Sequence, residues 1–150
     1  MKGTFLITQG FLKLVGTTKN ATIITVSTGA ALGIFPQVSA YSISKLATLQ
    51  LGAYVAAENA NITSITIHPG IIKTTMVPDT SPFSPFADDD ASLSGGLAVW
   101  LATHDAKFLN GRYVNANWDV DDLIARTEEI VSQNELVLGL KGKFGAAQFE

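Results

Sequence analysis

The segment Ala21-Thr-Ile-Ile-Thr-Val-Ser27 decides the fold, because a β-branched run of this kind predicts a strand. A second such run, Ile62-Thr-Ser-Ile-Thr-Ile67, ends at His68-Pro-Gly70. Between the two runs, the segment from Ser39 or Ala40 to Glu58 carries apolar residues around most of a helix, which predicts a helix buried on two sides. A strand, a helix and a strand in this order predict two parallel strands joined by a crossover helix.

The flanking segments extend this unit in both directions. Thr4 to Val15 has apolar residues at helical spacing and closes at a glycine, so it predicts a helix. Downstream, the patterns predict a helix over Leu93–Ala102, a third strand over Arg112–Asn115 and a final helix capped by Asp119. The expected fold class is therefore α/β, with roughly three parallel strands and flanking helices.

The composition limits what kind of protein this is. None of the 150 residues is a cysteine, only 15% are charged and 47% are hydrophobic. The lack of cysteine excludes disulfides and thiolate metal sites, and a net charge of −3 argues against a nucleic-acid partner. An average soluble domain has about 25% charged residues. Because a small domain cannot bury so much apolar surface alone, we expect a partner chain to cover part of it.

Neither a membrane segment nor a metal site is expected. The stretch 20–44 has no charged residue, but it holds a proline and too many serines and threonines for a spanning helix. The N-terminal residues offer no signal-peptide cleavage site, so we expect a cytoplasmic protein. His68 and His104 have no further ligands at metal spacing, and Asp88-Asp-Asp90 is typical of a solvated loop before a helix.

Tyr41-Ser-Ile-Ser-Lys45 is the sharpest candidate for chemistry. Residues four apart on a helix share a face, with Cβ atoms about 5–6 Å apart. An ammonium beside a phenol favours the phenolate, which suits the phenol to proton transfer near neutral pH. Ser27 and Thr28 lie at the end of the preceding strand, where a hydroxyl can hold the reacting oxygen. By itself a tyrosine and a lysine at this spacing are also common as packing residues.

The order of the motifs resembles the short-chain dehydrogenase/reductase family. The matching segments are Ile23–Gly29, Ser39–Ala47 and Ile67–Thr74. The resemblance implies the C-terminal part of a Rossmann-like domain over residues 1–138, followed by a loose tail over 139–150. In that family the tyrosine is the acid/base. The resemblance therefore gives this role to Tyr41, with Lys45 lowering its pKa and binding the nicotinamide ribose.

The resemblance also implies a nicotinamide cofactor, NAD or NADP. It assigns the border of the nicotinamide to Pro69, Gly70, Ile71 and Thr74. Thr28 stands where the family has its orienting serine. Ser27 is the alternative, although strand alternation points its side chain the other way.

Two features of the family are not matched. Its glycine-rich dinucleotide site and its catalytic asparagine precede the matching segments. Thr28-Gly-Ala-Ala-Leu-Gly33 imitates the glycine-rich fingerprint, but Phe35 replaces the third glycine, so an ordinary loop is expected. Without the strands that precede it in the family, the strand Ala21–Ser27 has an open edge.

Three functions are left open by the sequence. The first is NAD(P)-dependent carbonyl reduction or alcohol oxidation, in which Tyr41 gives the proton. The second is a cofactor-independent acid/base enzyme, such as an isomerase, lyase or cyclase. The third is a non-catalytic remnant. For the two enzymes we expect a small apolar substrate, which the loop from Met76 to Ala91 would cover. The helices 4–15 and 40–58 predict a homodimer, because the family pairs their equivalents across two subunits.

Overall fold

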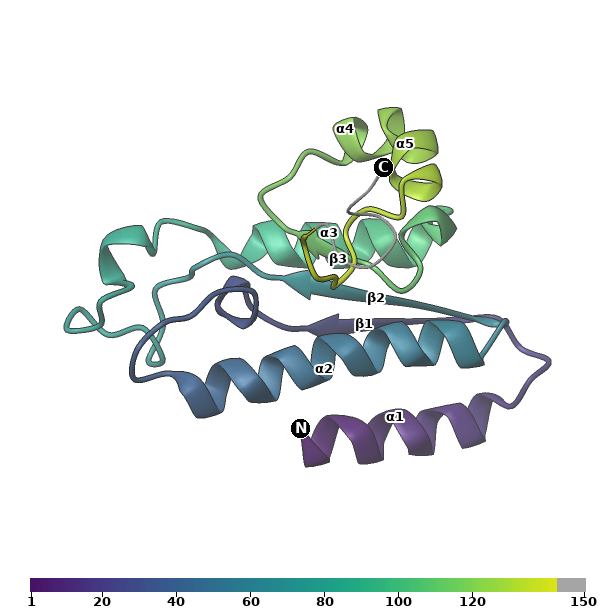
Figure 1. The fold of residues 1–150 in the computed structure, drawn as a ribbon, viewed down its shortest axis with the longest axis horizontal. Coiled ribbons are helices and arrows are strands. Elements are labelled where there is room, and N and C mark those ends of the chain that lie inside the picture. The colour runs from purple at the N-terminus through teal and green to yellow at the C-terminus, as the bar shows by residue number, and fades with distance from the viewer. Residues whose placement is uncertain (143–150) are drawn as a thin grey trace.

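A three-stranded parallel sheet forms the centre of the chain in the computed structural model, which describes residues 1–142 (Figure 1). The strand order is β1 (Ala21–Val26), β2 (Ile62–His68), β3 (Tyr113–Asn115). Helices α1 (Lys2–Val15) and α2 (Ser39–Glu58) lie on one side of the sheet, and α3 (Ala91–Thr103), α4 (Val120–Ala125) and α5 (Thr127–Ser132) lie on the other. The predicted α/β class and the three parallel strands are confirmed.

The central strand β2 has two different faces. It pairs with β1 from Ala21↔Ile62 to Val26↔Ile67, and with β3 over its last three residues. Its isoleucines at 65 and 67 are buried in one apolar core with α3, β3 and the C-terminal helices. Its small polar residues Ser64 and Thr66 face α2 instead, because side chains alternate along a strand.

Helix α2 packs very closely on that polar face. A Cβ added at Gly52 would stand 2.7 Å from the Thr66 hydroxyl oxygen, so only glycine allows this approach. Leu49 and Val55 are buried beside it. The opposite side of α2 is exposed in the single chain, with Tyr54 57% exposed. The predicted burial of this helix on two sides is therefore wrong for the single chain, because α1 covers only part of it.

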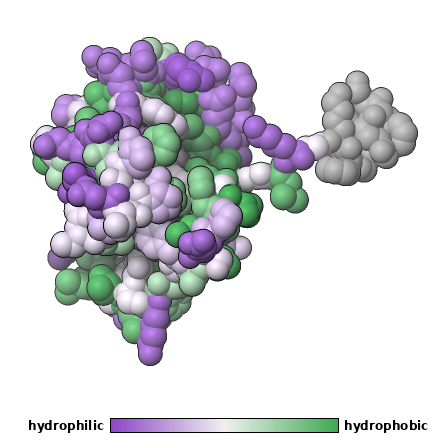
Figure 2. Space-filling model, turned by 90° about the vertical axis from the view of Figure 1, so that its left-hand side faces the viewer, coloured by the Kyte–Doolittle hydropathy of each residue, from purple (hydrophilic) through white to green (hydrophobic). Residues whose placement is uncertain are grey.

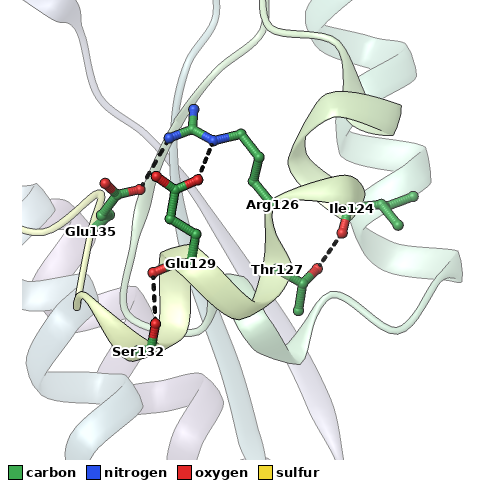
Figure 3. A network of polar contacts seen from close by, with 6 residues as sticks. All are labelled: Ile124, Arg126, Thr127, Glu129, Ser132 and Glu135. Atoms are coloured by element: carbon green, nitrogen blue, oxygen red, sulfur yellow. Dashed lines mark hydrogen bonds and ion pairs between the residues drawn. The ribbon is translucent and has the colours of Figure 1, made fainter.

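The C-terminal region differs from the single helix predicted after Asp119. Asp119 does cap α4, accepting from the Asp121 amide at 2.9 Å. The helix then breaks at Arg126, whose guanidinium pairs with Glu129 at 2.8 Å and with Glu135 at 3.4 Å (Figure 3). The Thr127 hydroxyl donates to the Ile124 carbonyl, a local bond that competes with helix continuation.

The tail predicted over 139–150 falls mostly outside the described residues, which end at 142 with no helix or strand after 132. Within 1–142, every helix is too short or too polar to cross a membrane.

Candidate active site

The candidate residues lie at the carboxyl ends of the strands, where the loops after β1 and β2 meet the start of α2 (Figure 1). Tyr41 is in the first turn of α2 and is 39% exposed. Lys45 is one turn further on the same helix, so the two side chains share a face. Among residues 1–142, no hydrogen bond joins the Tyr41 hydroxyl to Lys45, Ser27 or Thr28.

Lys45 is fixed to the end of β1 by two hydrogen bonds. Its ammonium donates to the Val26 carbonyl oxygen at 2.9 Å. Its own carbonyl accepts from the Ser27 hydroxyl at 3.0 Å, and Ser27 is only 2% exposed. The turn of α2 that carries the lysine is therefore held directly against the strand end.

The two candidate hydroxyls have different partners. Ser27 points to α2, as just described, while the Thr28 hydroxyl accepts from the Ala30 amide at 3.3 Å. Thr28 thereby caps the short 3-10 turn Gly29–Ala31. Which of the two orients a reacting oxygen remains a prediction.

The loop Pro69–Ile71 is held by Asp89, which the sequence had suggested to be solvated. One Asp89 oxygen accepts from the Ile71 amide at 2.6 Å, and the other accepts from the Asn117 side-chain amide at 2.5 Å. Gly70 has a φ of +91°, and a Cβ there would stand 2.6 Å from the carboxylate. The loop shape thus requires glycine at 70 and an acceptor at 89. Of the Asp88–Asp90 run, only Asp88 and Asp90 are exposed, and Asp90 caps α3.

Thr74 lies further along the same loop and is exposed. Its hydroxyl accepts from the Met76 amide at 3.3 Å, so it shapes the loop locally. It has no contact with Tyr41 or Lys45 among the hydrogen bonds of the described residues.

His68, at the end of β2, and the buried Tyr113, on β3, both lie near Gly29. Their side chains approach one point, since a Cβ added at Gly29 would lie 3.5 Å from the His68 ring and 3.9 Å from the Tyr113 hydroxyl. Burial lowers the pKa of His68 below its usual 6.5, and the nearby Asp89 carboxylate opposes this shift. Burial raises the pKa of Tyr113 to about 12. Within the described residues, the His68 Nδ1 is buried without a hydrogen-bond partner.

The described residues suit the nicotinamide end of a dinucleotide better than its pyrophosphate. Tyr41, Lys45 and the Pro69–Ile71 loop all lie at the end of the sheet where β1 and β2 end, which is where the family resemblance would place a nicotinamide ring. The segment Thr28–Gly33 after β1 does not form a phosphate-binding loop, because its only helical part is the three-residue 3-10 turn Gly29–Ala31. The Phe35 ring also lies close to this segment, since a Cβ added at Gly33 would stand 2.8 Å from it. A pyrophosphate site needs a longer helix with free amides at its start. Over residues 1–142, no strand–turn–helix offers one after a glycine-rich turn.

The loops that follow β1 and β2 carry exposed and mutually contacting apolar side chains. Phe35, after β1, and Phe83, after β2, meet edge to face with centroids 5.9 Å apart. Ile34 is 98% exposed and Met76 is 75% exposed. Figure 2, which looks onto the side of the molecule where the strands end, shows hydrophobic residues reaching the surface between polar ones. The predicted covering loop therefore contacts the loop that follows β1.

One further hollow on the surface lies away from the candidate catalytic residues. A hollow of about 390 Å³ between α3 and α4 is lined by Trp100, His104 and Phe108, and none of the candidate catalytic residues lines it. In the described part of the chain, no group of three acidic or histidine side chains is placed to hold a metal ion.

Comparison with known proteins identifies the family. The family model described as short chain dehydrogenase matches residues 1–84. A short chain dehydrogenase of Monascus purpureus is 35% identical over 144 residues, which are 93% of this chain and 49% of that protein. A short chain dehydrogenase/reductase of Claviceps purpurea is 37% identical over 129 residues, covering 81% of this chain and 44% of that protein. The chain belongs to the short-chain dehydrogenase/reductase family of oxidoreductases, and it spans about half the length of these relatives.

Solved structures agree with this assignment. An acetoin dehydrogenase of Enterobacter cloacae aligns with a TM-score of 0.62 and 27% identity, over 77% of this chain and 50% of that one. A Serratia marcescens short-chain dehydrogenase/reductase aligns with a TM-score of 0.67 and 20% identity, over 77% and 51%, and shows the shared fold. The predicted family and the Rossmann-like fold are confirmed. The roles of the individual site residues remain predictions.

Proposed function

We propose that the chain carries the proton-transfer part of a carbonyl reductase or alcohol dehydrogenase active site. In reduction, the Tyr41 hydroxyl donates its proton to the substrate carbonyl oxygen; in oxidation, the phenolate takes a proton from the alcohol. The ammonium of Lys45, one helical turn away, stabilises the phenolate by opposite charge. A nicotinamide bound at this site would supply the hydride in reduction and accept it in oxidation. Ser27 or Thr28 positions the oxygen.

The observation that carries this proposal is the anchoring of Lys45. Long lysine side chains on a helix surface usually extend into water. Here the Nζ is instead held at the strand end, 2.9 Å from the Val26 carbonyl oxygen, and the helix backbone is tied there by Ser27. A lysine and a tyrosine on one helix face, beside two hydroxyls at a strand end, are the groups that a polarised carbonyl oxygen requires.

Substrate and cofactor follow from the surroundings of the site. The exposed apolar rim, with Phe35 and Phe83 in contact, favours a small apolar carbonyl compound or alcohol as the substrate. NAD or NADP is the cofactor that family membership favours.

Titration with NADPH and with NADH tests the redox function. Trp100 and Trp118 provide the fluorescence signal. We expect saturable quenching below about millimolar cofactor, the range in which cofactor enzymes commonly work. An absence of quenching by either cofactor rejects cofactor binding by this chain alone.

A tyrosine substitution tests the acid/base assignment. Tyr41→Phe removes the hydroxyl, and we expect a fall of about 10²-fold or more in any carbonyl reduction, the usual share of a general acid. Tyr54→Phe is the matched control, since Tyr54 lies on the same helix and is 57% exposed. Equal activity of the two variants contradicts the role of Tyr41.

The second candidate is cofactor-independent proton transfer, and it is favoured by the poor fit to a pyrophosphate. Isomerisation or elimination on a small apolar substrate would still use Tyr41 and Lys45. Activity that needs Tyr41 and is unchanged by removal of NAD(P) would select this candidate. If neither activity nor cofactor binding is found, the non-catalytic alternative stands.

We also propose a homodimer through α1 and α2. Their outer sides carry exposed apolar residues, among them Leu14 at 81% and Ile43 at 66% exposure. We expect light scattering to give a dimer at micromolar concentration, and Ile43→Glu to shift it to monomer. Val99→Glu is the control, since Val99 is 64% exposed on α3 at the opposite face. A stable wild-type monomer at that concentration rejects the proposal.

A further inference from the structure

The hollow between α3 and α4 has an apolar floor. Its lining residues come from the end of α3, from the 3-10 turn Lys107–Leu109 and from the junction of α4 with α5. Trp100 and Phe108 are only partly buried: they pack against the apolar core and also line the hollow, together with Ile124. The volume of about 390 Å³ lies at the lower end of the range of small-molecule sites. The hollow therefore has room for one or two fused rings.

Aromatic side chains dominate this lining. The rings of Trp100 and His104 are stacked, with an interplanar angle of 17° and centroids 5.3 Å apart. Phe108 adds a third ring. Because contacts between aromatic rings contribute more than the burial of their area alone, such a lining favours an aromatic ligand over an aliphatic one.

The hydrogen bonds of His104 decide which ring nitrogen can receive a ligand. Nδ1 lies 3.1 Å from the Trp100 carbonyl oxygen and 3.0 Å from the Thr103 hydroxyl oxygen. A carbonyl oxygen can only accept, and the Thr103 hydroxyl already donates its proton to the Val99 carbonyl at 2.8 Å. In the neutral ring Nδ1 therefore carries the proton, and Nε2 is left as an acceptor.

Two further polar groups at the rim also accept. The Thr127 hydroxyl donates its proton to the Ile124 carbonyl at 2.8 Å, so only its lone pairs are left for a ligand. The Asp105 carboxylate accepts from the Lys107 backbone amide at 3.3 Å and has further lone pairs. The charges of Asp105 and Lys107 are opposite, so the rim favours neither a cation nor an anion. A neutral ligand that donates a hydrogen bond fits these groups.

We propose that the hollow is a ligand site separate from the candidate active site, and that it binds a neutral phenol of one or two fused rings. The rings lie against Trp100 and Phe108, and the phenolic O–H donates to Nε2 of His104. The size and the aromatic lining select the ring system, and the acceptors at the rim select the hydroxyl. The site is independent of the proposed function, because none of the candidate catalytic residues lines the hollow.

A fluorescence titration with 2-naphthol tests the site. The chain has two tryptophans, and Trp118→Phe leaves Trp100 as the only one. In this background we expect 2-naphthol to quench Trp100 saturably, with a dissociation constant of about 1 mM or tighter. Ile124→Glu adds a charge inside the hollow and should abolish the saturable quenching. Val131→Glu is the matched control, since Ile124 and Val131 are 49% and 51% exposed and only Ile124 lines the hollow.

The location of the site is rejected by either of two results. One is the absence of saturable quenching in the folded Trp118→Phe chain, and the other is unchanged binding by Ile124→Glu. Urea midpoints check that each variant is folded. Light scattering covers a different occupant: a lower mass for Ile124→Glu than for Val131→Glu would show that a second chain fills the hollow, and it overturns the proposal as well.

The variant His104→Phe tests the chemistry of the ligand. It keeps an aromatic ring beside Trp100 and removes both ring nitrogens. We expect 2-naphthol to bind about two- to tenfold more weakly, which is the worth of one hydrogen bond. The methyl ether 2-methoxynaphthalene has no O–H, so it should bind His104→Phe and the parent chain equally.

Equal binding of 2-naphthol by His104→Phe and the parent chain contradicts the assigned hydrogen bond. Tighter binding of 2-naphthoate than of 2-naphthol would make the ligand an anion, and it overturns the neutral phenol. Failure of NADPH or NADH to bind would refute only the redox function proposed above, because the naphthol titration contains neither cofactor.

Discussion

Replacing Asp89 with alanine tests how the loop at the candidate site is held. The carboxylate accepts from the Ile71 amide at 2.6 Å and from the Asn117 side chain at 2.5 Å. Hydrogen bonds to a charged group contribute about 1.5–3 kcal/mol each. Because Asp89 is only partly buried, we take the lower end for both bonds. The expected loss in the free energy of unfolding is about 3 kcal/mol.

Urea unfolding followed by tryptophan fluorescence measures this loss. Asp88→Ala is the matched control, because it removes the same charge from the neighbouring exposed position. Surface substitutions of this kind change stability by about 0.5 kcal/mol or less. Asp89→Asn keeps one acceptor, so we expect a loss between those of the two alanine variants. If Asp89→Ala is no less stable than Asp88→Ala, the carboxylate does not hold the loop.

Three further predictions concern stability and are read from urea midpoints. Ser27→Ala removes the hydrogen bond from the Ser27 hydroxyl to the Lys45 carbonyl and should lower the free energy of unfolding by about 1 kcal/mol. An unchanged urea midpoint contradicts this. Gly52→Ala should lower the free energy of unfolding by about 1–2 kcal/mol, because the clash with the Thr66 hydroxyl outweighs the higher helix propensity of alanine. Adding Thr66→Ala to the Gly52→Ala variant removes that clash and should restore the urea midpoint. The pKa of His68 is lowered in the folded chain, so below about pH 6.5 the unfolded chain binds the proton more readily and stability falls. In His68→Gln, stability should fall less between about pH 7.5 and pH 5.5 than in the wild type. An equal pH dependence of the urea midpoint in the wild type and the variant refutes this prediction.

The central part of the fold could be predicted because its signals are local. The β-branched runs that became β1 and β2 are bounded by turn residues, and the helix between them has the length of a crossover. Local sequence also explains the caps, since Asp119 and Asp90 each accept from an amide two residues further on.

The clamp on the loop could not be predicted, because its partners are remote in sequence. Asp89 contacts groups that are 18 and 28 residues away, and an aspartate between two others gives no sign of that. The same holds for His68 and Tyr113, which approach only because β3 pairs in parallel with the end of β2. Arg126, at which the helix breaks, pairs with Glu135, a partner nine residues further on that local sequence pattern does not indicate.

The two sides of the sheet bury different kinds of residue. The main apolar cluster lies on the side of α3, α4 and α5, where Leu101, Leu109 and Val114 are at most 1% exposed, and fewer apolar residues, among them Leu49 and Val55, are buried on the side of α2. On the side of α2, the sheet presents the small polar residues Ser64 and Thr66 instead. Burying the Ser64 and Thr66 side chains contributes little to the free energy of unfolding, because hydrophobic stabilisation scales with the apolar area that is buried. The exposed apolar surface of α1 and α2 is therefore the surface that the proposed second subunit would bury.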